Sequence, residues 1–524
     1  MDASPSQAPT TTAELPARHR WAALGVLAAA VLLLAIDGTV LALAVPALTE
    51  SLSPTAEQIL WIGDIYSLAL AGLLVLMGNL ADRFGRKRIL LAGSVAFGAA
   101  SLLAAFSTTA EMLIAARLLL GVAGATLMPS TLSLIRNIFP DDAERTRAIA
   151  VWSTAFGAGS AIGPLVGGFL LEHFWWGSVF LINIPVMVIV LVTGLILLPE
   201  SKDPNPGGFD VLSALLSMVT IVPIVYAITH VIGSGLNPVI IGCVIVGLAG
   251  GALFVRRQRR MDNPMLDVEL FRSPAFSGAV AANVISIFAL AGLLFFFSQY
   301  LQFARGYSPL QAGLAELPST IASIVVVAAI GVLAARLGRG RAIALGLSMA
   351  AAGLAFVALA ASADSYVWLA LCLVPIGFGI GLALTLTGDA IVAAAPPRKA
   401  GAVSAIAETG NELGVVLGIA VLGSLVSLVY RATVVVPDTV ALDVAARVED
   451  SIGAALNTLD PDDALASVAR DAFVTAMQAT SLVAAALTLG GAVVARLLIP
   501  SMRVPSGRST AEPARAGADL DATE

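Results

Sequence analysis

The stretch GNLADRFGRKRILLAG at residues 78–93 returns 253 positions later as GVLAARLGRGRAIALG at residues 331–346, with eight of sixteen positions identical. Each copy is a short basic turn between two long apolar runs, the pattern of a cytoplasmic loop that joins two transmembrane helices. Basic loops share some glycine and arginine by chance, but here the apolar flanks and the loop length also agree. The duplication therefore predicts two related membrane halves, an arrangement typical of secondary transporters.

The composition is that of an all-α integral membrane protein. Of the 524 residues, 58% are hydrophobic and 12% are charged, and the mean hydropathy is +0.92. Soluble domains carry about 25% charged residues. Cys243 and Cys372 lie inside apolar runs, where they act as small hydrophobic side chains and do not indicate a disulfide, a metal site or redox chemistry. The apolar run that starts at Trp21 is too long for the core of a signal peptide, so no cleavage is expected.

Fourteen transmembrane helices are predicted, because a span needs about 20 apolar residues. They are expected near residues 21–46, 58–80, 88–107, 112–134, 147–171, 177–198, 210–232, 236–255, 276–302, 312–335, 341–361, 366–386, 401–428 and 473–499. If both termini are cytoplasmic, 24 of the 29 basic residues fall on the inside and four on the outside, which leaves Arg117 within a helix. This asymmetry is what the positive-inside rule requires.

The position of the repeat divides the chain. We expect a six-helix bundle at residues 21–198, two inserted helices at 199–260, a second six-helix bundle at 261–499, and disordered cytoplasmic tails at 1–20 and 500–524. A long external segment at about 429–472 is rich in acidic residues around apolar stretches. It is either an acidic amphipathic cap or a solvated loop of no specific function.

Several motifs resemble those of the major facilitator superfamily. The first repeat copy resembles the superfamily's signature loop, and the fifth helix resembles its antiporter motif. Arg117 with Gly121 resembles its fourth-helix motif. The segments IDGTVLALAVP at 36–46 and WIGDIYSL at 61–68 resemble the fourteen-helix drug:proton antiporter branch, of the QacA and LfrA type of multidrug exporter. The residues concerned are Gly78, Asp82, Arg83, Gly85, Arg86 and Arg88 in the loop, and Gly159, Gly163, Pro164, Gly167 and Gly168 in the fifth helix. The resemblance covers most of the chain and implies two six-helix bundles that alternate access to a central site.

The resemblance implies that the signature loop is a conformational latch. Asp82 follows a helix in a tight turn beside Arg83 and Arg86, so it can form charge-assisted hydrogen bonds or cap a neighbouring helix. In the second copy Ala335 stands in its place, which predicts that the ionic lock has no counterpart in the other half. The fifth-helix glycines share a face and Pro164 weakens the helix there, which suits a gate, although ordinary close packing explains the glycines equally well.

Five acidic residues interrupt the apolar runs and are the candidate proton and cation sites. Each would cost roughly 3 kcal/mol or more if it were charged and faced lipid, so they are expected to face a cavity. Burial disfavours the charged form, so such a carboxyl could take up a proton on one side and release it on the other, or bind a lipophilic cation once deprotonated. They are Asp37, Asp64, Glu316, Glu408 and Glu412, with Arg117 as a proton relay.

Glu408 and Glu412 are four residues apart and therefore lie on one helical face. Glu316 lies near the external start of the tenth helix, where it could instead reach water. By resemblance, the family's proton and cation sites correspond to Asp37, Asp64, Glu408 and Glu412.

Three functions are compared. The first is proton-driven export of lipophilic cationic drugs, dyes and quaternary ammonium compounds across the bacterial cytoplasmic membrane, by a monomer that needs no cofactor, metal or nucleic acid. The second is export of one metabolite, such as an antibiotic, a lipid or a siderophore, by the same fold. The third is an intramembrane enzyme, which is disfavoured because His19, His173 and His230 lie in tails, loops or helix ends and no Walker motif is present.

Overall fold

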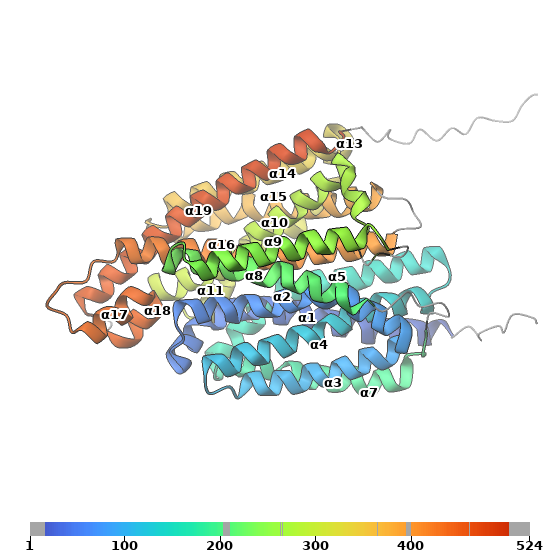
Figure 1. Ribbon diagram of the computed structural model, residues 1–524, viewed down its shortest axis with the longest axis horizontal. Coiled ribbons are helices and arrows are strands. Elements are labelled where there is room, and N and C mark those ends of the chain that lie inside the picture. The colour runs from blue at the N-terminus through green and yellow to red at the C-terminus, as the bar shows by residue number, and fades with distance from the viewer. Residues whose placement is uncertain are drawn as a thin grey trace, which may run out of the picture.

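The computed structural model describes residues 16–202, 210–261, 264, 266–363, 365–394, 400–460 and 462–501. Over this part of the chain every regular element is helical, as predicted. Thirteen of these helices are long and apolar enough to cross a membrane, or fourteen if the bent pair Pro309–Val325 and Val327–Leu337 is one span. The long helices run side by side along the longest axis of the molecule (Figure 1). Most of the tails expected at 1–20 and 500–524 lies outside the described residues.

The first half is a bundle of six spans. They are α1 (Ala17–Leu52), α2 (Ala56–Phe84), α3 (Arg86–Ala105), α4 (Ala110–Ile138), α5 (Asp142–His173), and α6 (Ser178–Leu181) followed by α7 (Asn183–Leu197). Side chains define the starts of several helices: Thr55 forms a capping box with Gln58, and Thr109 and Asp141 accept hydrogen bonds from the first turns of α4 and α5. Helix α1 begins four residues earlier than predicted.

Two helices, α8 (Val211–Ser234) and α9 (Pro238–Gln258), lie between the halves in sequence. Helix α8 packs against α2 of the first half, against α16 (Ala400–Thr433) of the second half, and against α9. Leu68, Val225, Val416 and Ala420 form a small buried cluster where α2, α8 and α16 meet. The inserted pair is therefore attached to both halves through α8 (Figure 1).

The second half contains the remaining spans. They are α10 (Pro274–Gln299), the broken span α11 (Pro309–Ala315), α12 (Leu317–Val325) and α13 (Val327–Leu337), then α14 (Arg339–Ala360), α15 (Tyr366–Ala393), α16 and α19 (Ala464–Leu498), with the short η1 (Val268–Arg272) before α10 and η2 (Tyr300–Ala304) after it. The prediction of one helix at 312–335 was wrong in detail. Pro318 cannot donate a backbone hydrogen bond, and the chain breaks at Glu316 and bends by 50° near Val326.

The segment expected as a loop at 429–472 is largely helical. Helix α16 continues to Thr433, α17 (Leu442–Asp450) and α18 (Ile452–Thr458) follow, and α19 begins at Ala464. These short helices form one extremity of the molecule, which we call the cap end (Figure 1). The opposite extremity, where Gly85 and Gly338 turn the chain in the two repeat copies, is called the arginine end.

The cap end joins the two halves. Asp450 Oδ2 accepts a hydrogen bond of 3.0 Å from the backbone N–H of Ala56, at the first turn of α2, and Asn457 Nδ2 donates to the carbonyl of Thr49 at 2.7 Å. Nearby, Gln302 Nε2 donates to the carbonyl of Leu43 at 3.1 Å. The cap-end segment is thus a contact surface between the halves, and the molecule is closed on this side.

Candidate functional site

A buried ion pair lies at the centre of the first half. Asp37 on α1 and Arg117 on α4 are each 2% exposed, and Arg117 Nη1 lies 3.3 Å from Asp37 Oδ2. Asn183, at the start of α7, donates from Nδ2 to Asp37 Oδ1 at 2.7 Å. A buried charge is tolerated when it is paired and hydrogen-bonded, and both oxygens of Asp37 meet this condition.

Contacts with α2 hold the side chain of Arg117 in place. Its Nε donates to the carbonyl of Ile62 at 3.2 Å, and its guanidinium carbon lies 4.5 Å from the ring centroid of Tyr66, which is cation–π distance. Both of these partners are on α2. Arg117 therefore connects α1, α2 and α4, and its position depends on all three helices.

Asp64 is the second buried carboxylate of the first half and has a different environment. It is 1% exposed, and neither carboxylate oxygen has a hydrogen-bond partner among the described residues. It lies one helical turn from Leu60, which contacts Gly423 of α16, and one turn from Leu68, which belongs to the buried cluster with α8 and α16. Asp64 is therefore buried along the seam between α2 and α16, which belong to different halves.

Glu408 and Glu412 lie on α16, on the other side of this seam. Both are partly exposed. Ser67 of α2 hydrogen-bonds to the Glu412 carboxylate, and Glu412 is close enough to Arg117 and to Glu408 to interact with them electrostatically. Glu412 thus reaches the first half, where Ser67 is three residues from Asp64.

Glu408 belongs to a polar chain inside the second half. Asn411 Nδ2 donates to Glu408 Oε2 at 3.2 Å, Asn283 Nδ2 of α10 donates to Asn411 Oδ1 at 2.6 Å, and Thr387 Oγ1 of α15 donates to Asn283 Oδ1 at 3.0 Å. Three helices are joined by these bonds, so the position of Glu408 is coupled to the packing of the second half.

Glu316 lies apart from the other four acids. It is the residue between α11 and α12, is 3% exposed, and its Oε1 has no hydrogen-bond partner among the described residues. The alternative that it reaches water is wrong for this conformation. Tyr366, whose hydroxyl donates to the adjacent carbonyl of Ala315 at 2.7 Å, covers this part of the break.

The fifth-helix glycines meet two different helices. A Cβ atom at Gly159 would lie 2.4 Å from the carbonyl oxygen of Leu32, and Gly163 and Gly167 face the next turns of α1 in the same way. Gly168 instead faces α11 of the other half, where a Cβ would lie 2.8 Å from Leu310 Cα. The Pro164 carbonyl also faces α11, 2.5 Å from where a Cβ at Gly313 would be. The motif therefore packs α5 on its own bundle and against the second half.

The signature loop makes its contacts within the first half. Arg86 Nε lies 2.8 Å from Asp82 Oδ1, Gly85 adopts a φ of 117°, and Gly78 packs against Pro129 of α4. Arg88 pairs with Glu200, which follows α7, at 3.5 Å. The structure gives Arg83 a contact with the neighbouring Phe84 ring, 5.9 Å from its centroid. The loop thus ties α2 and α3 to the end of α7.

The second repeat copy has an ion pair of its own. Arg339 is the counterpart of Arg86, and its Nη2 lies 2.9 Å from Asp389 Oδ2 on α15. The second copy has no acid at the position of Asp82, because Ala335 stands there. The prediction that this loop has no ion pair was nevertheless wrong, because Arg339 pairs with Asp389. The partner comes from a different helix, so the two loops are held in different ways.

Sequence reasoning missed the hydrogen-bonding partners of the acids. Asn183, Ser67, Asn283 and Asn411 each lie on a spanning helix, and each contacts a predicted site residue or its neighbour. Asn183 in the apolar run FLINIPVMVIVL offered a signal, because an amide within a span needs a partner as a carboxylate does.

Comparisons with known proteins agree with this architecture. The sequence matches the family described as Major Facilitator Superfamily over residues 27–419. It is 46% identical over 491 residues to the multidrug efflux pump LfrA of Mycolicibacterium smegmatis, covering 93% of this chain and 97% of that protein. It is 37% identical over 462 residues to the methyl viologen resistance protein SmvA of Salmonella typhimurium, covering 87% and 93%.

A more distant relative is the tetracenomycin C resistance and export protein of Streptomyces glaucescens, 32% identical over 504 residues and 93% of each chain. Among solved structures, a bacterial homologue of the human lysosomal transporter Spinster, in an inward-facing and unoccupied conformation, superimposes with a TM-score of 0.64. It covers 92% of this chain and 98% of that one at 17% identity, which establishes a shared fold.

Proposed function

Since the chain belongs to the Major Facilitator Superfamily of membrane transporters, we propose that it is a proton-coupled antiporter that exports lipophilic cationic drugs and dyes. The proposed location is the bacterial cytoplasmic membrane, with the arginine end and both termini in the cytoplasm. Its relatives are named for multidrug efflux and for resistance, one of them to methyl viologen, an organic dication. These names support a drug exporter, and the arrangement of the acids supports the cationic charge of its substrate.

The observation that carries the proposal is the state of Asp64. Its carboxylate is buried at the seam between the halves, and neither oxygen is hydrogen-bonded to a residue that the structure describes. A carboxylate without a partner in a site of low dielectric constant is stable there when it is protonated or when a cation lies beside it. Proton and cationic substrate would then compete for Asp64, which couples uptake of one to release of the other.

Glu412 extends this site to the second half. It approaches Ser67, one turn from Asp64, so a substrate bound between α2 and α16 would be near acids from both halves. Separation of the halves at the cap end would move Glu412 relative to Asp64, because each is fixed on its own helix. The affinity for a cation would then differ between the two conformations, as alternating access requires.

Asp37 has a different role in this proposal. Arg117 already provides its positive partner, at 3.3 Å, and Asn183 occupies its other oxygen. It is therefore the first-half acid least available to a cation. We assign it to proton transfer, with Arg117, which interacts electrostatically with both Asp37 and Glu412, as the relay between them.

The experiment measures proton movement in inside-out vesicles. Ethidium or a quaternary ammonium salt is added to an established pH gradient, and wild type is compared with Asp64→Asn and Glu412→Gln. The control is Asp471→Asn, which makes the same chemical change at an exposed position of α19. Collapse of the gradient in wild type and the control, but not in the site variants, is the expected result.

Two results would contradict the proposal. If correctly inserted wild type gives no response to any lipophilic cation, the alternative of an exporter dedicated to one metabolite would replace multidrug export. If Asp64→Asn collapses the gradient as wild type does, the unpaired carboxylate does not couple the two fluxes.

A further inference from the structure

The inserted helices form a groove that the transport proposal does not use. It lies between α8 and α9 and has a volume of about 690 Å³. It is lined by Thr220 and Ile224 of α8, by successive turns of α9 from Gly247 to Arg256, and by Arg259 and Arg260, which follow the helix. Helix α9 is at the periphery: Ile245 is 60% exposed and Leu248 is 64% exposed. In a membrane protein such apolar exposure faces lipid, so the groove opens to the bilayer.

Small residues make the groove. A Cβ atom at Gly247 would lie 2.6 Å from Ile224 Cγ1, and one at Gly250 would lie 3.1 Å from Val219 Cγ1, so both glycines allow the two helices to approach closely. Gly251 and Ala252 continue the stripe one turn toward the arginine end. Because they carry almost no side chain, a channel remains along the surface of α9.

The groove ends in arginines. Arg256, Arg259 and Arg260 line its end and are exposed. Among the residues that the structure describes, no carboxylate lies within ion-pair distance of these three. Arg256 follows Ala252 by four residues and continues the same face of α9, and Arg259 and Arg260 come directly after the helix ends at Gln258. The groove is therefore apolar along its length and strongly basic at its end.

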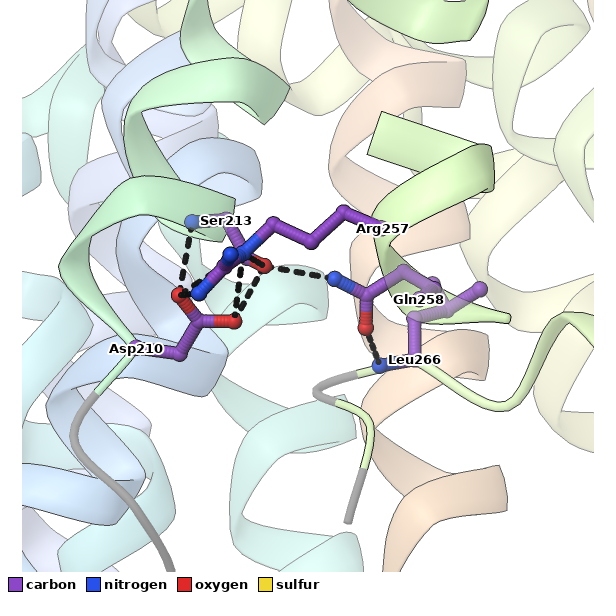
Figure 2. A network of polar contacts seen from close by, with 5 residues as sticks. All are labelled: Asp210, Ser213, Arg257, Gln258 and Leu266. Carbon is purple, nitrogen blue, oxygen red and sulfur yellow. Dashed lines mark hydrogen bonds and ion pairs between the residues drawn. The ribbon is translucent and has the colours of Figure 1, made fainter. Parts of the chain in front are cut away.

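The fourth arginine of this run has a separate role, shown in Figure 2. Arg257 Nη2 lies 2.9 Å from Asp210 Oδ1, at the start of α8. Gln258 Nε2 donates to Ser213 Oγ at 2.6 Å, and Gln258 Oε1 accepts a hydrogen bond of 3.0 Å from the backbone N–H of Leu266. This network fastens the end of α9 to the start of α8 and to the segment that leads to α10. The other three arginines take no part in this network.

We propose that this groove binds one anionic phospholipid, with its phosphate on Arg256, Arg259 and Arg260 and an acyl chain along Gly247 and Gly251. Guanidinium groups bind phosphate through paired, charge-assisted hydrogen bonds. The nine residue steps from Gly247 to Arg256 span about 13.5 Å along the helix, close to half of the roughly 30 Å hydrocarbon core. The groove thus matches one leaflet in length and an anionic headgroup in charge.

The lipid would lie beside an element that touches both halves. Helix α8 packs against α2 and α16, the two helices of the seam. A lipid that stabilises the α8–α9 pair would therefore support the element that connects the halves.

Binding is measured on the purified full-length protein in nonionic detergent, so the result does not depend on transport. Fluorescent phosphatidylglycerol is titrated onto wild type, and unlabelled phosphatidylglycerol, phosphatidylcholine and glycerol phosphate are used as competitors. Replacing Arg256, Arg259 and Arg260 by Gln is expected to weaken binding about 100-fold, since each basic residue near an anionic lipid contributes roughly a factor of five. The charge-matched control replaces the exposed Arg136, Arg147 and Arg496 and should bind as wild type does.

A second variant tests the groove without changing charge. Ala252→Trp fills the groove from an exposed position, and Val246→Trp places the same side chain on another face of α9. Loss of binding in the first alone supports the proposal. The proposal is overturned if phosphatidylcholine competes as well as phosphatidylglycerol, if glycerol phosphate alone displaces the probe, or if both arginine triples weaken binding equally.

Discussion

The contact between Asp450 and α2 predicts how strongly the cap end holds the molecule closed. Asp450 belongs to the second half and accepts a hydrogen bond of 3.0 Å from Ala56 N–H, at the N-terminus of α2 in the first half. A carboxylate at this position satisfies an otherwise unpaired donor and interacts favourably with the helix dipole. Arg431 holds the other oxygen at 2.8 Å, but this ion pair lies within the second half.

Only the contact that crosses between the halves contributes to closure. A carboxylate that caps a helix start stabilises the closed state by about 1 to 1.5 kcal/mol. The net value is small because water takes over the hydrogen bond to Ala56 N–H when the halves separate. Asp450→Ala should therefore shift the ratio of closed to open molecules by about five- to twelvefold, because 1.4 kcal/mol corresponds to a factor of ten. Arg431→Ala should have a smaller effect, because it removes an exposed ion pair worth about 0 to 1 kcal/mol.

The population can be measured by pulsed electron spin resonance between labels at Thr108 and Ser362. These exposed positions lie in cap-end turns of the first and second half respectively. The background replaces both native cysteines, Cys243 and Cys372, which are free thiols. Asp450→Ala should enlarge the fraction of long distances. The control is Asp443→Ala, an exposed acid of α17. An unchanged distribution in Asp450→Ala, or an equal change in the control, would refute the reasoning.

Three further predictions concern other parts of the molecule. Arg117→Leu leaves the buried Asp37 charge without its partner and should lower stability by about 3 to 5 kcal/mol, whereas the double variant with Asp37→Asn should recover much of this in a thermal unfolding assay. Burial would raise the pKa of Asp210, but hydrogen bonds from Arg257 and Ser213 outweigh it and hold the pKa below the ordinary 3.8. The stabilisation is thus complete above the ordinary pKa of Asp210 and is lost as pH falls through its lowered pKa in the folded protein. The difference in stability between wild type and Asp210→Asn should therefore be constant from about pH 8 to 5 and become smaller below about pH 4. Gly168→Val places a Cβ 2.8 Å from Leu310 Cα, so it should disfavour closure by about 1 to 3 kcal/mol in the same distance measurement, and unchanged distances would contradict this packing argument.

The sequence was sufficient for the helical architecture because its signals are local. The sorting of the 29 basic residues depends only on which loop each one occupies. The described part of the chain has thirteen candidate spans, or the predicted fourteen if the bent pair is one span. The broken tenth span was not foreseen. Pro318 was visible in the sequence, but whether a proline bends a helix or begins one depends on its neighbours.

The environment of each acid could not be predicted, because it depends on contacts between helices distant in sequence. Asp37 and Asn183 are 146 residues apart and hydrogen-bonded. Asp64, also a buried aspartate of the first half, has no such partner in the described part of the chain. Nothing in the sequence distinguishes these two aspartates. For the cap end, the apolar stretches among the acidic residues allowed an amphipathic cap as one of two interpretations, but did not indicate that α18 would pack against α1, α19 and η2.

The contact of α8 with both α2 and α16 makes the two flanks of the transporter unequal. On one flank, α8 covers the seam, and the cluster around Leu68 and Val225 seals it from the bilayer. On the other flank α5 meets α11, and Phe169 and Leu314 are about half exposed, at 50% and 48%, so no helix of the described part of the chain covers them. If the chain exports lipophilic compounds, as proposed above, a compound dissolved in the membrane would find the junction of the halves covered on the α8 flank and accessible on the α5–α11 flank.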